Sequence, residues 1–122
     1  MSNTGSSPRR GEVWFADLNP TLGHEQAGRE QAGRRPILII SADAYNAGQS
    51  DMVIALPVTS RMRSLPGRVP ILPPEGGLKV SSDILCGHVR AIAQQRLVRR
   101  WGNVGAPTLL AAERVLRLLL QL

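Results

Sequence analysis

The sequence predicts a mainly β protein, an antiparallel β barrel that carries one C-terminal α-helix. Short apolar runs follow one another between residues 12 and 101, and connections that contain Gly, Pro or charged residues separate them. This pattern is typical of barrels and sandwiches. After residue 107 the leucines instead recur with the period of an amphipathic α-helix.

The first half of the chain contains three predicted strands. Residues 12–18 alternate apolar and polar side chains and end at the Asn19-Pro20 turn. Residues 37–41 are a continuous, mostly β-branched run, typical of a strand buried on both faces. Residues 43–49 are predicted to form a turn or a single helical turn. Residues 52–58 form the third strand, in which Pro57 indicates a bulge or an edge position.

The second half adds shorter strands and the helix. Strands are expected at 69–72, at 82–88 and 89–93 (or as one strand bent at Gly87), and at 97–101. Pro107 marks the start of the helix, because its missing N–H costs nothing in the first turn. The helix is apolar to its last residue, and extra apolar surface of this kind usually indicates a partner.

Length and cysteine content predict one domain at residues 10–122, preceded by a polar tail, residues 1–9, that we expect to be disordered. The single cysteine, Cys86, lies in an apolar strand pattern and is expected to be a buried small side chain. No disulfide framework, signal peptide or membrane-length run is present, so we expect a cytoplasmic protein without membrane contact.

Charge favours a nucleic-acid partner. The chain has fifteen Lys and Arg against nine Asp and Glu, a net charge of +6, and Lys79 is its only lysine. Guanidinium groups bind phosphate through two hydrogen bonds and stack on bases. GC-rich genomes also replace Lys by Arg, so the uneven distribution of charge along the chain is more informative than the excess of arginine. After Asp83 the only acid is Glu113.

The chain is organised around the polar, glycine-containing loop before the second strand. Residues 23–41 read GHEQAGREQAGRRPILIIS, in which the pentapeptide EQAGR occurs twice, at 25–29 and 30–34. Pro36 restricts its own φ and pushes Arg35 toward an extended conformation. Arg35 therefore stands at the start of a rigid strand, with acid, imidazole and amide groups before it, where a reacting anion would be held.

Three segments together resemble the MazF/PemK family of toxin endoribonucleases: GEVWFADLNPTLGHEQAG, GRRPILIIS and VIALPVTS. The similarity extends from about Arg10 to the C-terminus. One departure is the second copy of EQAGR, where the family has one. It lengthens the loop by five residues and leaves open which copy faces the substrate.

The resemblance implies an SH3-like barrel of the CcdB/PemK type that forms a homodimer. It also implies a sequence-selective endoribonuclease that cleaves single-stranded RNA to a 2′,3′-cyclic phosphate and a 5′-hydroxyl, the toxin of a type II toxin–antitoxin system. A MazE-like antitoxin with an acidic segment would occupy the same basic groove. The chain has no His cluster or acidic pair with metal-ligand spacing, so we expect neither metal nor other cofactor.

Such a reaction needs a base for the ribose 2′-hydroxyl, an acid for the leaving 5′-oxygen and stabilisation of the phosphorane charge. Arg35 suits charge stabilisation and resembles the family's catalytic arginine. Thr59 resembles the catalytic threonine, whose hydroxyl can donate to a phosphate oxygen. Ser60, Arg61 and Arg34 are predicted to bind RNA beside them.

The identity of the base stays open. Glu25 and Glu30 both match the family's E-Q position, and spacing back from Arg35 favours Glu30 as catalytic with Gln31 beside it. Glu25 is then an RNA-binding candidate. His24 and His88 titrate near neutral pH and are alternatives.

His88 and Arg90 are predicted to face the RNA from one side of a strand. Some relatives carry a participating acid at the position of Gly87 and a basic residue at that of Leu85, so that mechanism does not transfer. Two rival functions remain: a non-catalytic toxin that binds DNA gyrase, as the related CcdB proteins do, and an inactive RNA-binding barrel. Arg35 together with Thr59 argues against the first.

Overall fold

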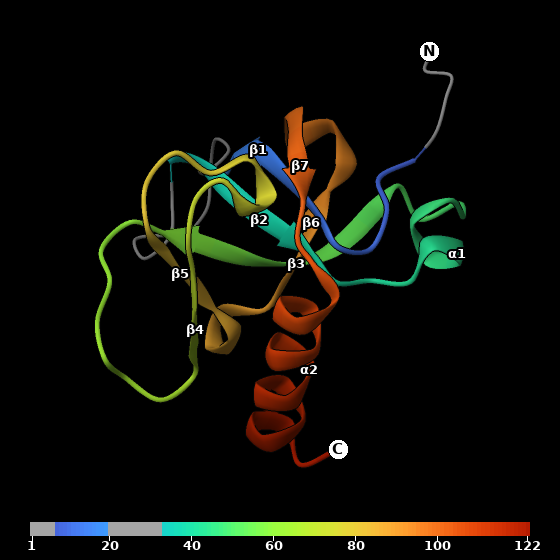
Figure 1. The fold of residues 1–122 in the computed structure, drawn as a ribbon. Helices are drawn as coiled ribbons and strands as arrows, with labels where there is room; N and C mark the ends of the chain where they lie inside the picture. The colour runs from blue at the N-terminus through green and yellow to red at the C-terminus, as the bar shows by residue number, and fades with distance from the viewer. Residues whose placement is uncertain (1–6, 20–32) are drawn as a thin grey trace.

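The computed structural model describes residues 7–19 and 33–122, which form a bent antiparallel sheet with one long helix at the C-terminus (Figure 1). The strands in this part of the chain are β1 (Glu12–Asp17), β2 (Arg34–Ile39), β3 (Met52–Thr59), β4 (Arg68–Ile71), β5 (Ser82–Leu85), β6 (Arg90–Ala93) and β7 (Leu97–Asn103). The helices are α1 (Asp43–Asn46) and α2 (Ala106–Leu120), with 3₁₀ turns η1 (Glu75–Gly77), η2 (Cys86–His88) and η3 (Gln94–Arg96).

All strand pairs are antiparallel, in the order β4-β5-β3-β2-β1-β7, and β6 also pairs with β3. The predicted class, mainly antiparallel β with a C-terminal helix, is therefore confirmed. Within the described residues the end strands β4 and β7 do not pair with each other, so the hydrogen-bonded ladder does not close into a complete barrel.

Strand β3 lies at the centre of the sheet, not at its edge. One side pairs with β2, and the other pairs first with β6, at residues 52–55, and then with β5, at residues 58 and 59. Pro57 falls where β3 passes from one partner to the next, so its missing N–H interrupts neither ladder. The edge position suggested by Pro57 is therefore wrong.

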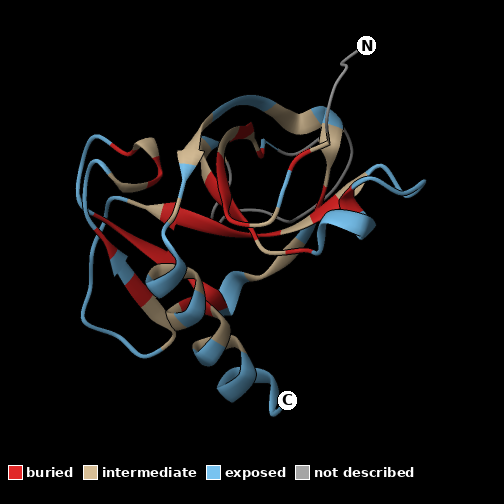
Figure 2. Cartoon of the chain, turned by 45° about the vertical axis from the view of Figure 1, so that its right-hand side comes forward, coloured by how far each residue is buried: buried red, intermediate tan, exposed pale blue. Residues whose placement is uncertain are grey.

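Two apolar clusters lie against the sheet. One contains Leu38, Leu56 and Ile84 and is covered by α2, whose Ala112 is fully buried. The other contains Ile37, Ile39 and Val53. Consecutive residues of β2 therefore enter different clusters, as the continuous apolar run predicted. Figure 2 shows the sheet as the buried centre, while the C-terminal end of α2 is exposed.

The segment predicted as strand at 82–88 is interrupted. β5 ends at Leu85, and η2 follows before β6 begins at Arg90. The interruption moves the chain from one half of β3 to the other, so the bend lies in the region of Gly87, as expected. Cys86 is fully buried, and burial raises the pKa of its thiol to about 11.

The described residues before β1 contact the rest of the fold. Asn46 Nδ2 donates a hydrogen bond of 3.0 Å to the Pro8 carbonyl, and Arg9 N donates to Glu12 Oε1 at 2.8 Å. The Arg10 guanidinium hydrogen-bonds the Ile40 carbonyl and pairs with Glu113 of α2. These contacts join the start of the domain to α1, to the residue after β2 and to α2. None of the helices in the described part of the chain is long and apolar enough to cross a membrane.

Candidate active site

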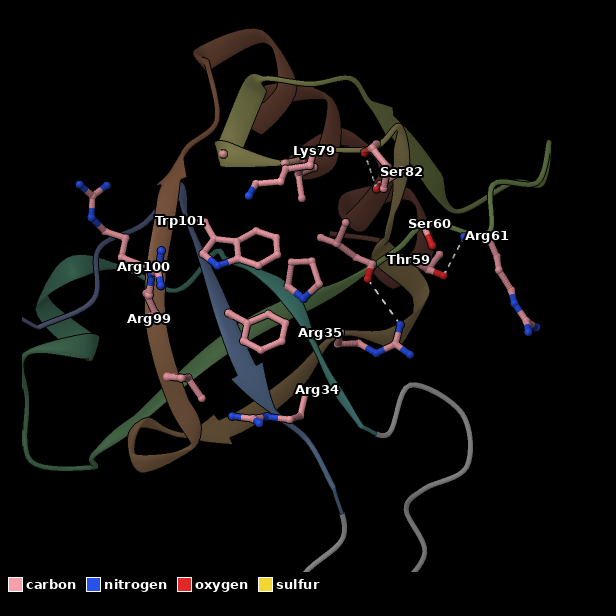
Figure 3. Close-up of a pocket in the computed structure, with 17 residues that line it drawn as sticks. Arg34, Arg35, Thr59, Ser60, Arg61, Lys79, Ser82, Arg99, Arg100 and Trp101 are labelled. Atoms are coloured by element: carbon pink, nitrogen blue, oxygen red, sulfur yellow. Dashed lines mark hydrogen bonds between the residues drawn. The ribbon is translucent and has the colours of Figure 1, made fainter.

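The described structure contains an open groove of about 1220 Å³ (Figure 3). Its walls come from the start of β2, the end of β3, the segment after η1, and strands β1 and β7. The lining residues are Phe15, Arg34, Arg35, Pro36, Val58, Thr59, Ser60, Arg61, Gly77, Leu78, Lys79, Val80, Ser82, Val98, Arg99, Arg100 and Trp101.

The groove is strongly cationic. Its lining includes Arg34, Arg35, Arg61, Lys79, Arg99 and Arg100, and no Asp or Glu is among its described lining residues. Several like charges around a hollow that excludes part of the solvent focus the positive potential and raise the local concentration of anions. The groove is therefore suited to a polyanion.

Arg35 is the second residue of β2, and it lines the groove. Its Nη1 donates a long hydrogen bond of 3.5 Å to the carbonyl of Val58, the residue before Thr59 (Figure 3). Burial lowers the pKa of Arg35, but an arginine remains protonated at neutral pH. Because the antiparallel pairing of β2 with β3 places the start of one strand beside the end of the other, the two predicted residues share one end of the groove.

Thr59 is the last residue of β3, and its hydroxyl is oriented by the turn that follows. Its Oγ1 accepts a hydrogen bond of 3.1 Å from the backbone N–H of Arg61. This bond uses an oxygen lone pair, so the hydroxyl hydrogen can still donate to an anion. Ser60 and Arg61 are exposed next to it.

An ion pair between buried Asp83 and half-buried Arg68 holds this turn in place. Asp83, only 3% exposed, lies opposite Thr59 in the β3–β5 ladder. Its Oδ2 accepts hydrogen bonds from the Arg63 backbone N–H at 2.9 Å and from Arg68 Nη1 at 3.0 Å. The same Arg68 nitrogen donates to the Arg61 carbonyl at 2.9 Å. The turn after Thr59 is thus fixed by contacts that the sequence did not indicate.

An aromatic pair forms another part of the groove. The rings of Phe15 and Trp101, from the neighbouring strands β1 and β7, are parallel within 7° with centroids 5.2 Å apart. The Arg34 guanidinium carbon lies 5.8 Å from the Phe15 centroid, within reach of a cation–π interaction. Five groove residues were not predicted from the sequence: Phe15, Trp101, Lys79, Arg99 and Arg100.

The structure gathers half of the predicted site residues. Arg34, Arg35, Thr59, Ser60 and Arg61 line the groove, whereas His88 and Arg90 do not. His88 is exposed on η2, beside α2. Arg90 lies opposite Ala55, where burial and then the charge of Arg96 lower its pKa. Glu25, Glu30 and Gln31 lie outside the described residues.

Comparison with known proteins identifies the family. The model of the PemK-like, MazF-like toxin of type II toxin–antitoxin systems matches residues 9–120. The chain is 33% identical to endoribonuclease MazF9 of Mycobacterium tuberculosis over 119 residues, which cover 93% of this chain and 97% of the relative. It is 36% identical to endoribonuclease EndoA of Bacillus subtilis over 91 residues, 73% of each chain.

Solved structures agree with this relationship. The crystal structure of MazF from Deinococcus radiodurans superposes with a TM-score of 0.80 at 34% identity, covering 97% of this chain and all of that one. A MazE–MazF structure from the same organism gives a TM-score of 0.71 at 29% identity, with 95% and 97% covered. The chain belongs to the PemK-like, MazF-like toxins of type II toxin–antitoxin systems, which confirms the predicted family.

Proposed function

We propose that this protein is a metal-independent endoribonuclease that cleaves single-stranded RNA in the groove, with Arg35 and Thr59 at the scissile phosphate. The observation that carries the proposal is the position of Arg35, hydrogen-bonded to the residue before Thr59 inside a groove lined by cations. The relatives MazF9 and EndoA are named as endoribonucleases and support the same reaction class.

In the proposed reaction the ribose 2′-oxygen attacks the neighbouring phosphorus. The new O2′–P bond forms as the P–O5′ bond breaks, which gives a 2′,3′-cyclic phosphate and a 5′-hydroxyl. The Arg35 guanidinium donates to the phosphorane oxygens, where the negative charge increases, and the Thr59 hydroxyl donates to one of them. Neither group needs to change its own protonation state.

Two proton transfers complete the reaction. A base takes the 2′-hydroxyl proton, and the leaving 5′-oxygen receives one. We assign the base to Glu30, the carboxylate whose spacing before Arg35 matches the family pattern, with Gln31 beside it and Glu25 as the second copy. Comparing Glu30→Gln with Glu25→Gln tests this, since the loss of rate should be much larger for the first.

RNA on either side of the cleaved bond would bind the remaining cations. Arg34 and Arg61 flank Arg35 and Thr59 in the groove, and Ser60 adds a hydroxyl. His88 and Arg90 could contact RNA only beyond the groove, so their predicted role requires a longer path along the surface. Phosphate contacts of this kind make binding steeply dependent on salt.

The same groove fits an antitoxin. A segment rich in Asp and Glu would pair with its cations and cover Arg35, which would block access of RNA. A solved structure from Deinococcus radiodurans contains MazE together with MazF, a relative of this chain, and supports a partner of this kind. We therefore propose a MazE-like antitoxin, a homodimeric toxin and action on RNA in the cytoplasm.

The test is incubation of the purified protein with a mixed RNA in excess EDTA, followed by mapping of the new 5′ ends. Arg35→Ala protein, prepared identically, controls for contaminating nuclease. We expect cuts at one short sequence, with 5′ ends that ligate only after phosphorylation. Cleavage that EDTA abolishes would reject metal independence. No cleavage by either protein would favour the non-catalytic, gyrase-binding alternative.

A further inference from the structure

The mechanism leaves the aromatic part of the groove without a role. Trp101 lines the groove, and Figure 3 shows its ring within the hollow, away from Arg35 and Thr59. Its ring is parallel to that of Phe15, but a centroid separation of 5.2 Å is that of an offset pair. Neither ring therefore covers the other completely, and because both half-buried residues line the groove, the pair presents part of its π surface to the hollow.

The backbone that carries Trp101 is held in place before any ligand binds. A Cβ on Gly77 would lie 2.3 Å from the Trp101 carbonyl oxygen, and one on Gly102 would lie 2.9 Å from the Gly76 carbonyl carbon. The η1 backbone therefore packs directly on β7 at this point, which only glycine allows. Trp101 also packs against the apolar cluster under α2. Binding of a ligand to Trp101 therefore requires little further ordering of this part of the protein, and the loss of conformational entropy is small.

Cations surround this π surface. Lys79 follows η1, Arg99 precedes Trp101 by two residues, and the Arg34 guanidinium lies over Phe15. Flat aromatic surface alternating with cations is what single-stranded nucleic acid requires, since its bases stack while its phosphates pair with charge. An acidic peptide would use the cations but has no general need for a flat π surface.

We propose that Trp101, backed by Phe15, is a nucleobase-stacking subsite that takes a base of the RNA flanking the bond cut at Arg35 and Thr59. This inference rests on the proposed function for the RNA substrate, but it concerns binding and not the chemical step. Because every base has a π face, the subsite adds affinity for single strands without selecting a sequence.

Tryptophan fluorescence can test the subsite directly. The chain has two tryptophans, and Trp14 is elsewhere: its Nε1 donates to Glu12 at 2.9 Å and its ring packs on the other apolar cluster. The probe is a mixed-sequence oligonucleotide with 2′-O-methyl ribose throughout, which cannot be cut by 2′-hydroxyl attack. We expect it to quench the fluorescence of the full chain, and we expect most of that quenching to be lost in Trp101→Phe.

Affinity provides the second measurement. Trp101→Ala should weaken binding of the uncuttable oligonucleotide by about five-fold to about 150-fold, the usual effect of losing one stacked base. Trp101→Phe should recover part of this loss. A control oligonucleotide of the same length with abasic sugars keeps the phosphates, and it should bind wild type and Trp101→Ala equally.

Three results would overturn the subsite. These are equal affinity of wild type and Trp101→Ala for the base-containing oligonucleotide, an equal loss for the abasic one, or quenching by an acidic peptide but not by the oligonucleotide. Cleavage is scored separately on an all-ribose RNA. A wild-type protein that binds bases through Trp101 but cuts nothing would overturn the proposed function and leave the subsite standing.

Discussion

Replacing Arg35 with lysine separates charge from geometry at the proposed active site. Lysine keeps the positive charge, but an ammonium cannot span two phosphorane oxygens as a guanidinium does. Removing one preorganised donor from a developing oxyanion usually lowers kcat by about 10²–10³, or about 2.7–4 kcal/mol. We expect Arg35→Ala to lose at least this much and Arg35→Lys to lose nearly as much.

Destabilisation of the fold in the Arg35 variants cannot account for a loss of activity of this size. Arg35 is half-buried near the start of β2, and its hydrogen bond to Val58 is at the long limit. Its removal should lower the free energy of unfolding by about 1 kcal/mol. A domain with a typical stability of about 5–15 kcal/mol then stays almost entirely folded. A hundred-fold loss of activity in a folded variant must therefore come from the site.

The assay is single-turnover cleavage of a labelled RNA that contains the mapped site, with thermal unfolding measured in parallel. Arg34→Lys is the matched control, because Arg34 is the neighbouring arginine, is exposed and lines the same groove. Its effect should fall on binding and stay below about ten-fold. A change below ten-fold in both Arg35 variants would refute the assignment of Arg35 to the phosphorane.

Four further predictions concern other parts of the chain. Deleting residues 30–34 leaves GHEQAGRRP, and we expect stability within ~1 kcal/mol of wild type and nearly unchanged cleavage; a folded variant that no longer cuts RNA would show that the longer loop belongs to the site. Leu119→Asp, at an exposed position of α2, should convert a dimer to a monomer in light scattering, and it is a cleaner test than Leu116, which packs on the core; unchanged mass and activity would remove Leu119 from the interface. Asp83→Asn should lower the free energy of urea unfolding by about 3–5 kcal/mol, because Arg68 is left without its counter-charge; a loss under about 1 kcal/mol would show that the pair does not hold the turn. Burial raises the pKa of Cys86 to about 11, so stability that is complete below the pKa of an unfolded thiol, about 8.5, should fall as the pH rises toward 11; Cys86→Ala should flatten that fall, and identical pH profiles would contradict the shift.

Arg35 and Thr59 were predicted because they resemble the family's catalytic residues, and the local sequence pattern explains why the two residues meet. Arg35 precedes a proline and an apolar run, and Thr59 ends the next long apolar run. Because these strands pair as antiparallel neighbours, the start of the first and the end of the second must meet. The same reasoning identified α2, whose period is unambiguous over its full length.

The missed residues depend on contacts between distant segments. Trp101 and Arg99 enter the groove because β7 pairs with β1 at the far edge of the sheet, and Lys79 because η1 packs on β7. Asp83 binds Arg68 across the β4–β5 hairpin. No periodicity in a single sequence encodes these approaches.

For His88 and Arg90, the predicted RNA contact depended on strand alternation. Reading residues 82–93 as nearly continuous strand put both side chains on one face toward the RNA. The structure inserts η2 between β5 and β6, so the alternation does not carry through, and neither residue lines the groove. The polar and glycine residues around Gly87 were the available signal for this break.

The most direct test of the account uses two RNA oligonucleotides that differ by one oxygen atom. Both contain the mapped cleavage sequence, and one has a 2′-deoxyribose immediately 5′ to the scissile phosphate. In EDTA, the protein should cut the all-ribose strand to a 2′,3′-cyclic phosphate and a 5′-hydroxyl and leave the substituted strand intact. Equal cleavage of both strands would show that water, and not the 2′-hydroxyl, attacks the phosphorus, and it would contradict the mechanism assigned to Arg35 and Thr59.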